Sequence, residues 1–252
     1  MALLTVHDLS KSFGGVQAVD GVSFALDPAE RLALIGPNGA GKTTCFNLIG
    51  GQIKPDRGEI LLSGQSMVGL LPRQIGRLGV GRTFQITATF ASMTVQENVQ
   101  MALIAHHRRI LDWIPYAYRL YRAEAMALLE QVNMAEQAHR LCGILAYGDL
   151  KRLELAVALA QKPQLLLMDE PTAGMARQER LELMQLISQI VQEQAIGVLF
   201  TEHDMDVVFG YADRVLVLDR GRLLATGSPA DIRANPEVQA IYLGQPLSAQ
   251  VD

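Results

Sequence analysis

The feature that most constrains this chain is a glycine-rich segment, Gly36-Pro37-Asn38-Gly39-Ala40-Gly41-Lys42-Thr43-Thr44. It fits the pattern G-x-x-x-x-G-K-[ST] of a phosphate-binding loop. The apolar run at 31–35 predicts a buried strand before it, and residues 44–49 predict the first turns of a helix after it. Strand, loop and helix in this order are the setting in which such a loop binds a nucleotide. A flexible glycine-rich surface turn would need neither neighbour.

Each residue type in this loop has a physical role. The glycines let backbone N–H groups turn inward around phosphate oxygens, and the helix N-terminus adds unpaired N–H groups with a partial positive charge. We expect Lys42 to place its ammonium on the β and γ phosphates and Thr43 to place its hydroxyl on Mg²⁺. The predicted ATP-binding residues of the loop are Pro37, Asn38, Gly39, Ala40, Gly41, Lys42, Thr43 and Thr44.

Composition narrows the class of protein. The chain has 252 residues, 49% of them hydrophobic, which suffices for one large α/β domain or a core with a subdomain. Lys and Arg number 22 against 26 Asp and Glu, for a formal charge of −4. This balance argues against wrapping nucleic acid as the main function, and we expect no nucleic-acid partner, although a local basic patch remains compatible with it. Cys45 and Cys142 are the only cysteines, which favours a reducing compartment without a disulfide framework or cysteine metal site.

The first residues have no basic stretch followed by an apolar core, so we expect no signal peptide. No apolar run is long enough to span a bilayer. We therefore expect a chain that is soluble by itself but is able to dock on a membrane protein.

Turn and periodicity signals predict short strands at both sides of the loop. Residues 3–6 and 22–26, with turns at Gly14-Gly15 and Asp20-Gly21, predict a small antiparallel sheet. Further strands are expected at 59–62, 80–85, 164–168, 196–201, 213–218 and 222–226. Helices are expected at 72–78, 94–104, 122–132, 150–160, 177–192, 202–209, 229–234 and 236–243. Thr94 and Glu97 form a capping-box pattern, and 94–141 forms the bulk of a helical insert.

A second strong signal is Leu165-Leu166-Leu167-Met168-Asp169-Glu170. The run lacks alternation, which predicts a strand buried on both faces, and its two carboxylates lie at the end where open parallel sheets bind ligands. Asp169 would hold Mg²⁺ through its water shell, and Glu170 would polarise the attacking water as general base. Alone, a solvated strand end would explain the pair equally well; the phosphate loop upstream favours the catalytic interpretation.

The third signal is Leu145-Ala146-Tyr147-Gly148-Asp149, just before a predicted helix. Here the chain resembles the ATP-binding-cassette (ABC) ATPases, whose signature is Leu-Ser-Gly-Gly-Gln. Only the leucine and the second glycine match, and Ala146 lacks the usual serine hydroxyl. The resemblance implies that Ala146, Tyr147, Gly148 and Asp149 face the ATP of a partner subunit.

The same resemblance implies further roles, residue by residue. Gln85 matches the Q-loop glutamine that joins Mg²⁺ and attacking water to movement of the insert. His203 matches the switch histidine that contacts the γ-phosphate, and Phe13 matches the aromatic residue that stacks on adenine, with a core phenylalanine as the alternative. The catalytic set is then Glu170, His203, Gln85 and Lys42, and the Mg²⁺ set Thr43, Gln85 and Asp169. Ala176 stands where the D-loop usually has Asp or Asn.

The resemblance covers nearly the whole chain and implies the fold. We expect an α/β phosphate-loop NTPase core with a mainly parallel sheet, an N-terminal antiparallel β subdomain and an inserted helical subdomain. Residues 1–252 would form a single ABC ATPase domain, with 1–93 and 158–252 as the nucleotide-binding core and 94–157 as the helical part with the signature.

Three stretches resemble the ATPases of branched-chain amino acid importers: the Ala-Tyr-Gly-Asp signature, Arg82-Thr83-Phe84-Gln85, and 235–244. This implies an ATP-hydrolysing subunit at the cytoplasmic face of the inner (plasma) membrane, with ATP and Mg²⁺. Its partners would be a second, related ABC ATPase subunit, two transmembrane permease subunits and, indirectly, a solute-binding protein. Urea and amide importers share much of this pattern, so the solute stays open.

Several alternatives remain at this point. A soluble cassette protein acting on ribosomes or DNA usually carries two cassettes or a long coiled-coil insert, and this chain has neither. A phosphate-loop kinase or GTPase would need a lid or an Asn-Lys-x-Asp tetrapeptide, which is absent. A degenerate regulatory cassette disagrees with the intact Lys42, Asp169, Glu170 and His203. The aromatic and basic segment 106–122 fits a nucleic-acid or membrane patch or, more commonly, an exposed helical face; we favour docking of a membrane subunit for part of it.

Overall fold

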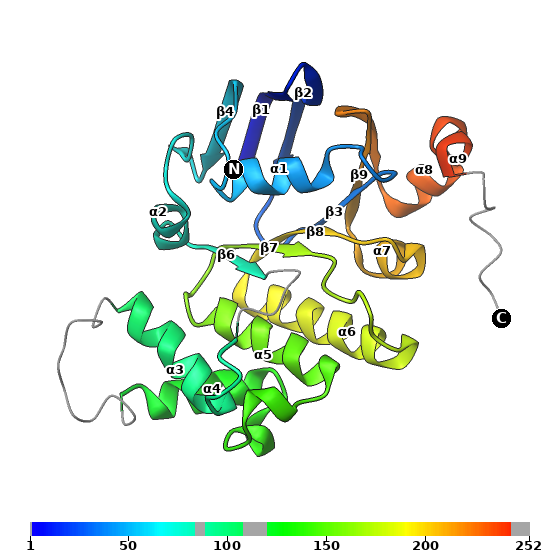
Figure 1. The fold of residues 1–252 in the computed structure, drawn as a ribbon. Coiled ribbons are helices and arrows are strands. Elements are labelled where there is room, and N and C mark those ends of the chain that lie inside the picture. Colours follow the sequence, from blue (N-terminus) through cyan, green and yellow to red (C-terminus); the bar gives the residue numbers. More distant parts are fainter. Residues whose placement is uncertain (1, 84–88, 108–119, 243–252) are drawn as a thin grey trace.

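The computed structural model describes residues 2–83, 89–107 and 120–242, and within these ranges the strands form two sheets (Figure 1). The smaller sheet is antiparallel, in the order β2-β1-β4-β5. Its strands are β1 (Leu4–Phe13), β2 (Val16–Leu26), β4 (Arg57–Leu62) and β5 (Gln65–Ser66). This is the antiparallel subdomain that the hairpin-like pattern predicted.

The larger sheet has the order β10-β9-β3-β8-β7-β6. Neighbours from β9 to β6 are parallel, and only β10 is antiparallel, to β9. The strands are β3 (Arg31–Ile35), β6 (Val80–Thr83), β7 (Leu165–Asp169), β8 (Gly197–Thr201), β9 (Arg214–Asp219) and β10 (Arg222–Gly227). The predicted mainly parallel sheet is therefore confirmed.

Helices cover both faces of the larger sheet. Figure 1 shows α1 between the two sheets, while α5 and α6 lie under the opposite face, with α3 and α4 beyond them. The helices are α1 (Lys42–Ile49), α2 (Pro72–Arg77), α3 (Val95–His106), α4 (Arg122–Gln131), α5 (Tyr147–Leu159), α6 (Arg177–Gln194), α7 (Met205–Tyr211), α8 (Pro229–Ala234) and α9 (Pro236–Tyr242). No helix in the described ranges is long and apolar enough to cross a membrane.

Two hydrophobic cores divide the faces of the parallel sheet between them. In β7, Leu165 and Leu167 pack in the core shared with α1 and the antiparallel sheet, whereas Leu166 and Met168 pack in the core shared with the helices on the other side. A strand with both faces covered needs apolar residues at every position, which explains the missing alternation. The prediction for residues 164–168 is thus confirmed.

The capping box at the start of α3 is confirmed as well. Glu97 N–H donates to Thr94 Oγ1 at 3.2 Å, and Thr94 N–H donates to Glu97 Oε2 at 2.7 Å. These reciprocal bonds satisfy backbone donors that a helix start would otherwise leave unpaired, and they fix where α3 begins.

Two local predictions are wrong. Asp20 and Gly21 lie inside β2 rather than in a turn, because both residues face the single Ser10 of β1 in a β-bulge, with Gly21 at φ 67°. Helix α5 begins at Tyr147 instead of Leu150, so the signature residues form its first turn. The helix also crosses the predicted boundary at residue 157, and the division into subdomains stays a prediction.

Candidate functional site

The phosphate loop joins β3 to α1 by a path that only glycine permits at two points. A Cβ atom at Gly36 (φ 155°) would lie 2.3 Å from the Leu218 carbonyl oxygen, and one at Gly41 (φ 105°) would lie 2.4 Å from that of Ala18. Gly41 is also the N-cap of α1 and has no side chain to cover the first N–H groups of the helix. The start of α1 is therefore left for an anion to cap.

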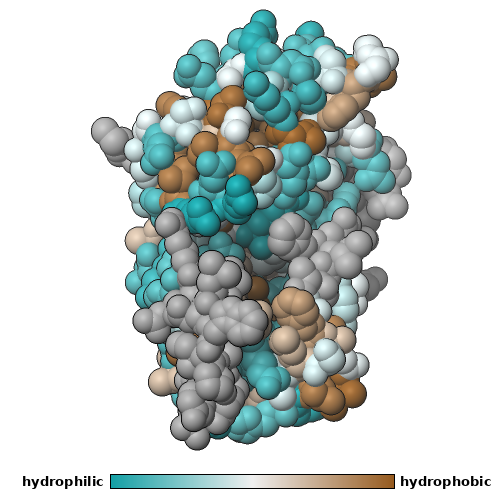
Figure 2. Space-filling model, turned by 60° about the vertical axis from the view of Figure 1, so that its left-hand side comes forward, coloured by the Kyte–Doolittle hydropathy of each residue, from teal (hydrophilic) through white to brown (hydrophobic). Residues whose placement is uncertain are grey.

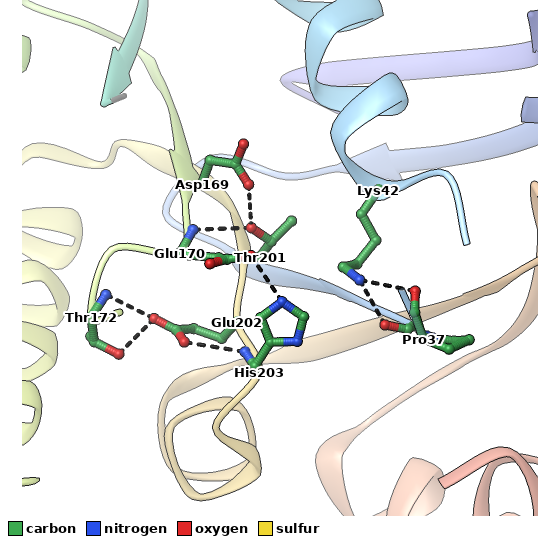
Figure 3. A network of polar contacts seen from close by, with 9 residues as sticks. Pro37, Lys42, Asp169, Glu170, Thr172, Thr201, Glu202 and His203 are labelled. Carbon is green, nitrogen blue, oxygen red and sulfur yellow. Dashed lines mark hydrogen bonds and ion pairs between the residues drawn. The ribbon is translucent and has the colours of Figure 1, made fainter. Parts of the chain in front are cut away.

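Lys42 lies in the first turn of α1 and folds back over the loop (Figure 3). Its Nζ donates to the carbonyl oxygens of Gly36 at 2.7 Å and Pro37 at 3.2 Å. Burial lowers the pKa of the ammonium, while the nearby charges of Glu170 and Asp169 raise it again. The ammonium of Lys42 is thus held by two neutral carbonyl oxygens of the loop, within range of the charges of Glu170 and Asp169.

Asp169 is the last residue of β7 and pairs with Thr201, the last residue of β8; Glu170 follows Asp169 directly. Thr201 Oγ1 donates to Asp169 Oδ1 at 2.7 Å and accepts a bond from the Glu170 N–H at 3.0 Å. Glu170 has φ 50°, an uncommon backbone conformation for a residue with a side chain. Thr201 therefore orients both acidic residues as the chain turns away from the strand.

His203 follows β8 and meets Glu170 across the strand ends. Its Nε2 lies 2.8 Å from Glu170 Oε1, and Figure 3 shows the ring pointing toward the end of β7. Because β8 lies between β3 and β7 in the sheet, His203 stands between the phosphate loop and the acidic pair. The imidazole and the carboxylate form one hydrogen-bonded unit at the carboxyl edge of the sheet.

An open cleft of about 210 Å³ brings the loop and this unit together. Its lining comprises Ala18, Asn38, Gly39, Ala40, Gly41, Lys42, Thr43, Thr44, Glu170 and His203. Residues more than 160 positions apart in the chain, such as Asn38 and His203, therefore face one space; Pro37 and Asp169 are not among its lining. The cleft offers backbone N–H groups, an ammonium, hydroxyls, a carboxylate and an imidazole to a phosphorylated ligand.

Other predicted residues lie elsewhere. Phe13 is at the end of β1 with 48% of its surface exposed, so it is no core residue, and Lys11 Nζ lies 5.5 Å from its ring centre. Ala146, Tyr147, Gly148 and Asp149 start α5 and are absent from the cleft lining in the described part of the chain. Gln85 lies outside the described residues.

Sequence reasoning missed three residues of the site. Ala18 lines the cleft from β2, Thr201 orients the acidic pair, and Glu202 contacts the turn after Glu170. The polar run Thr201-Glu202-His203 at the end of an apolar strand was a usable signal for two of them. Ala18 gave none, because its place depends on how β2 packs against the loop.

The donor set suits Mg²⁺ in its chemistry. Thr43 offers a hydroxyl in the cleft, and Asp169 offers a carboxylate at the strand end; these are hard oxygen ligands of the kind that Mg²⁺ prefers. Among the described residues no group of three or more His, Cys, Asp or Glu side chains is arranged to hold a metal alone. The oxygen ligands of this chain thus suit an ion that keeps waters and binds substrate phosphates.

Comparison with known proteins bears on the identity of this cleft. A family model described as ABC transporter matches residues 19–173, and one described as branched-chain amino acid ATP-binding cassette transporter matches residues 222–246. The chain is 42% identical to the high-affinity branched-chain amino acid transport ATP-binding protein LivG of Escherichia coli K12, covering 96% of this chain and 98% of LivG. It is 41% identical to BraF of Pseudomonas aeruginosa, a protein of the same description, over the same shares.

The fold agrees with these relatives. A crystal structure of a nucleotide-free ATP-binding cassette from an ABC transporter superposes with a TM-score of 0.86 at 29% identity, covering 96% of this chain and 99% of that one. The phosphate loop, the acidic strand end and the histidine unit thus lie in a fold known from ABC cassettes. The chain belongs to the ABC transporter family as an ATP-binding subunit and is an ATPase.

Proposed function

We propose that this chain powers an importer of branched-chain or related amino acids, hydrolysing ATP at the cytoplasmic face of the membrane. The observation that carries the proposal is the similarity to LivG and BraF over 96% of the chain. The match at 222–246, beyond the region that the general family model covers, supports the same subgroup. Membrane-embedded partner subunits would carry the solute.

The cleft supports a division of labour among its residues. The loop N–H groups and Lys42 bind the phosphate chain, so Lys42 exchanges the carbonyl oxygens of Gly36 and Pro37 for phosphate oxygens. Glu170 accepts a proton from the attacking water, and His203 holds the Glu170 carboxylate from the side of β8. Phe13, exposed at the end of β1, stacks on the adenine.

Mg²⁺, when bound by Thr43 and Asp169 with Gln85, supplies neutralising charge to the phosphate oxygens. Asp169 is nearly buried, and Thr201 holds one of its oxygens at 2.7 Å, which limits the directions its carboxylate can take. A fixed carboxylate costs little reorganisation during the reaction. The role of Thr201 is therefore to orient a metal-binding group.

A second ATPase subunit completes the site. The first turn of α5 lies away from this chain's own cleft, and Tyr147 within it is 43% exposed. This exposure suits a surface that meets the nucleotide of another cassette, which we infer to be a related, different chain. Since ATP then touches both subunits, its binding closes the pair and its hydrolysis releases them.

Exposed apolar residues support a docking face for the permease subunits. Phe90, Leu141 and Ile144 are 53%, 48% and 64% exposed, and the backbone of 91–94 bonds to that of 141–143, so the three lie on neighbouring segments. Leu71, at the start of α2, is 51% exposed. Figure 2 shows hydrophobic residues gathered in places on the face it draws, among hydrophilic ones. Exposed apolar residues that lie together on neighbouring segments, as Phe90, Leu141 and Ile144 do, suit contact with another protein.

Isolation of the tagged chain from its native membrane tests this assignment. We expect one related cassette and two multi-span permeases to co-purify, and the reconstituted complex to take up leucine, isoleucine or valine only with ATP and a solute-binding protein. Uptake of urea or an amide instead would refute the proposed solute. Co-purification with ribosomes or DNA and without a membrane protein would refute the transport role.

A further inference from the structure

Glu202 is a buried carboxylate to which the site described above assigns no role. It is 4% exposed and follows the last residue of β8. Its Oε1 accepts bonds from Thr172 N–H at 2.9 Å and Thr172 Oγ1 at 2.6 Å, and its Oε2 accepts a bond from His203 N–H at 3.2 Å (Figure 3). Burial raises the pKa of Glu202, and these bonds lower it. Burying a carboxylate costs free energy unless hydrogen bonds compensate for the lost water, so each of these three bonds contributes to keeping Glu202 in place.

These bonds close a ring of contacts around the catalytic pair. Thr172 lies two residues after Glu170, in the turn that leaves β7, and His203 is the next residue after Glu202. The ring is completed by the 2.8 Å contact between His203 Nε2 and Glu170 Oε1. Glu202 thus joins the backbone that carries the histidine to the backbone that carries the carboxylate.

A different residue anchors the other side of His203. Asp204 caps α7 by accepting bonds from the N–H groups of Asp206 and Val207, and its second oxygen pairs with Arg180 of α6. This anchor reaches α6 and α7 but not the turn after β7. Of the two side chains that flank His203, Glu202 is therefore the one that contacts the turn after Glu170, whereas Thr201 ties the end of β8 to Asp169 and to the Glu170 N–H.

We propose that Glu202 is a positioning residue for ATP hydrolysis. Its hydrogen bonds to Thr172 and to the His203 N–H hold the His203 side chain in position against Glu170. The inference rests on the proposed roles of Glu170 and His203 and extends them to a residue that does not line the cleft. Glu202 touches neither the phosphate loop nor Lys42 in the described contacts, so its loss should slow hydrolysis and leave ATP affinity intact.

Two substitutions separate the bonds. In Glu202→Gln the amide oxygen still accepts from Thr172, but its NH₂ group cannot accept the His203 N–H, so the bond to the His203 backbone is lost. Glu202→Ala loses the bonds to both residues. Because a misplacement of about 1 Å costs on the order of 100-fold in rate, we expect kcat to fall roughly 10-fold in the glutamine variant and further in the alanine variant. ATP affinity should stay within about 2-fold, since every loop contact is kept.

The chain contains a control with the same hydrogen-bond pattern at an exposed position. Glu97 accepts from Thr94 N–H at 2.7 Å and Thr94 Oγ1 at 2.9 Å, as Glu202 does from Thr172, but it belongs to α3, away from the cleft. Glu97→Gln should leave kcat unchanged. It measures what losing this pair of bonds does to thermal stability where the carboxylate is exposed, and any larger loss in Glu202→Gln reflects burial.

The experiment measures kcat, ATP affinity and thermal unfolding for the full chain in its transporter complex. A second measurement records the imidazole NMR signal of His203 in the nucleotide-free chain. We expect that signal to shift in Glu202→Gln and not in Glu97→Gln. Wild-type kcat in Glu202→Gln, an unshifted His203 signal, or an affinity loss that parallels a fall in melting temperature would each overturn the proposal. If Glu202→Ala does not fold, the glutamine variant decides. Undiminished turnover in Glu170→Gln would instead overturn the proposed function of the site itself.

Discussion

Replacing Ala146 by serine would test the start of α5. Ala146 occupies the N-cap with φ −65° and ψ 155°, the extended conformation of a capping residue, yet no side chain caps the helix there. A serine fits this backbone without strain and brings Oγ within reach of the N–H of Asp149, the third residue of the helix. The substitution therefore adds one capping bond and, at the predicted signature, one hydroxyl.

The size of the stability effect follows from the cap. Serine in place of alanine at an N-cap stabilises by about 1 kcal/mol, within a range of roughly 0.5 to 2. For a domain of this size, about 1 kcal/mol corresponds to a rise of about 2 to 4 °C in Tm. If the hydroxyl also reaches the ATP of a partner, ATPase activity of the assembled complex should be equal to or higher than that of the wild type.

Ala176 provides the control for stability. It is the N-cap of α6 with nearly the same backbone, φ −65° and ψ 153°, and is also an alanine. Ala176→Ser should raise Tm by the same amount, and a calorimetric scan of both variants measures it. Unchanged Tm in both would refute the capping argument. A marked loss of ATPase in Ala146→Ser, with its Tm gain kept, would refute the view that a missing hydroxyl weakens this signature.

Three other substitutions test the cleft. Glu170→Gln should bind ATP normally but hydrolyse it about 100-fold or more slowly, because the general base is lost; undiminished phosphate release would exclude Glu170 as that base. Lys42→Ala should weaken ATP binding by roughly 10- to 100-fold, as expected for the loss of a charge-assisted bond. Lys54→Ala, which removes an exposed lysine, should leave the affinity unchanged. Equal affinities of the two variants in titration calorimetry would contradict the loop assignment. Gly41→Ala should lower the free energy of unfolding more than Gly39→Ala. Both glycines have positive φ, but of the two only Gly41 would bring a Cβ against a backbone oxygen, at 2.4 Å. Equal urea midpoints would contradict the steric argument.

The sequence predicted those parts of the fold whose signal is local. Helix α6 and strands β7 and β8 were found because each is encoded by a run of neighbouring residues: a helical period in one case, unbroken apolar stretches in the others. Asp169 and Glu170 were found for the same reason, since Asp169 ends such a strand and Glu170 follows it, whereas the role of His203, two residues after β8, came from the resemblance together with its place at a strand end. A parallel sheet then brings strand ends to one edge whatever the order of its strands.

Non-local features could not be predicted in this way. The bulge at Asp20-Gly21 depends on pairing with Ser10 across β1, and Asp-Gly by itself favours a turn. The bond from Thr201 to Asp169 joins residues 32 positions apart and requires that β7 and β8 be neighbours in register. No periodicity in the sequence states which strands pair, so a polar residue that acts on another strand stays unrecognised until the order of the sheet is known.

The position of α5 links two sites that the sequence presents separately. Its C-terminal end leads within a few residues into β7, the strand that presents Glu170, and at its N-terminal end Tyr147 packs against Gly174 in the turn after that strand. A buried ion pair between Lys151 and Glu154, with N and O 3.1 Å apart, stiffens the first turns of the helix. The signature end of α5 is thus in contact with the turn that follows Glu170, while the other end of the helix leads to the start of the same strand. Two motifs that are separate in the sequence therefore meet in the fold, because α5 and β7 run side by side in opposite senses along the chain path from the signature to Glu170.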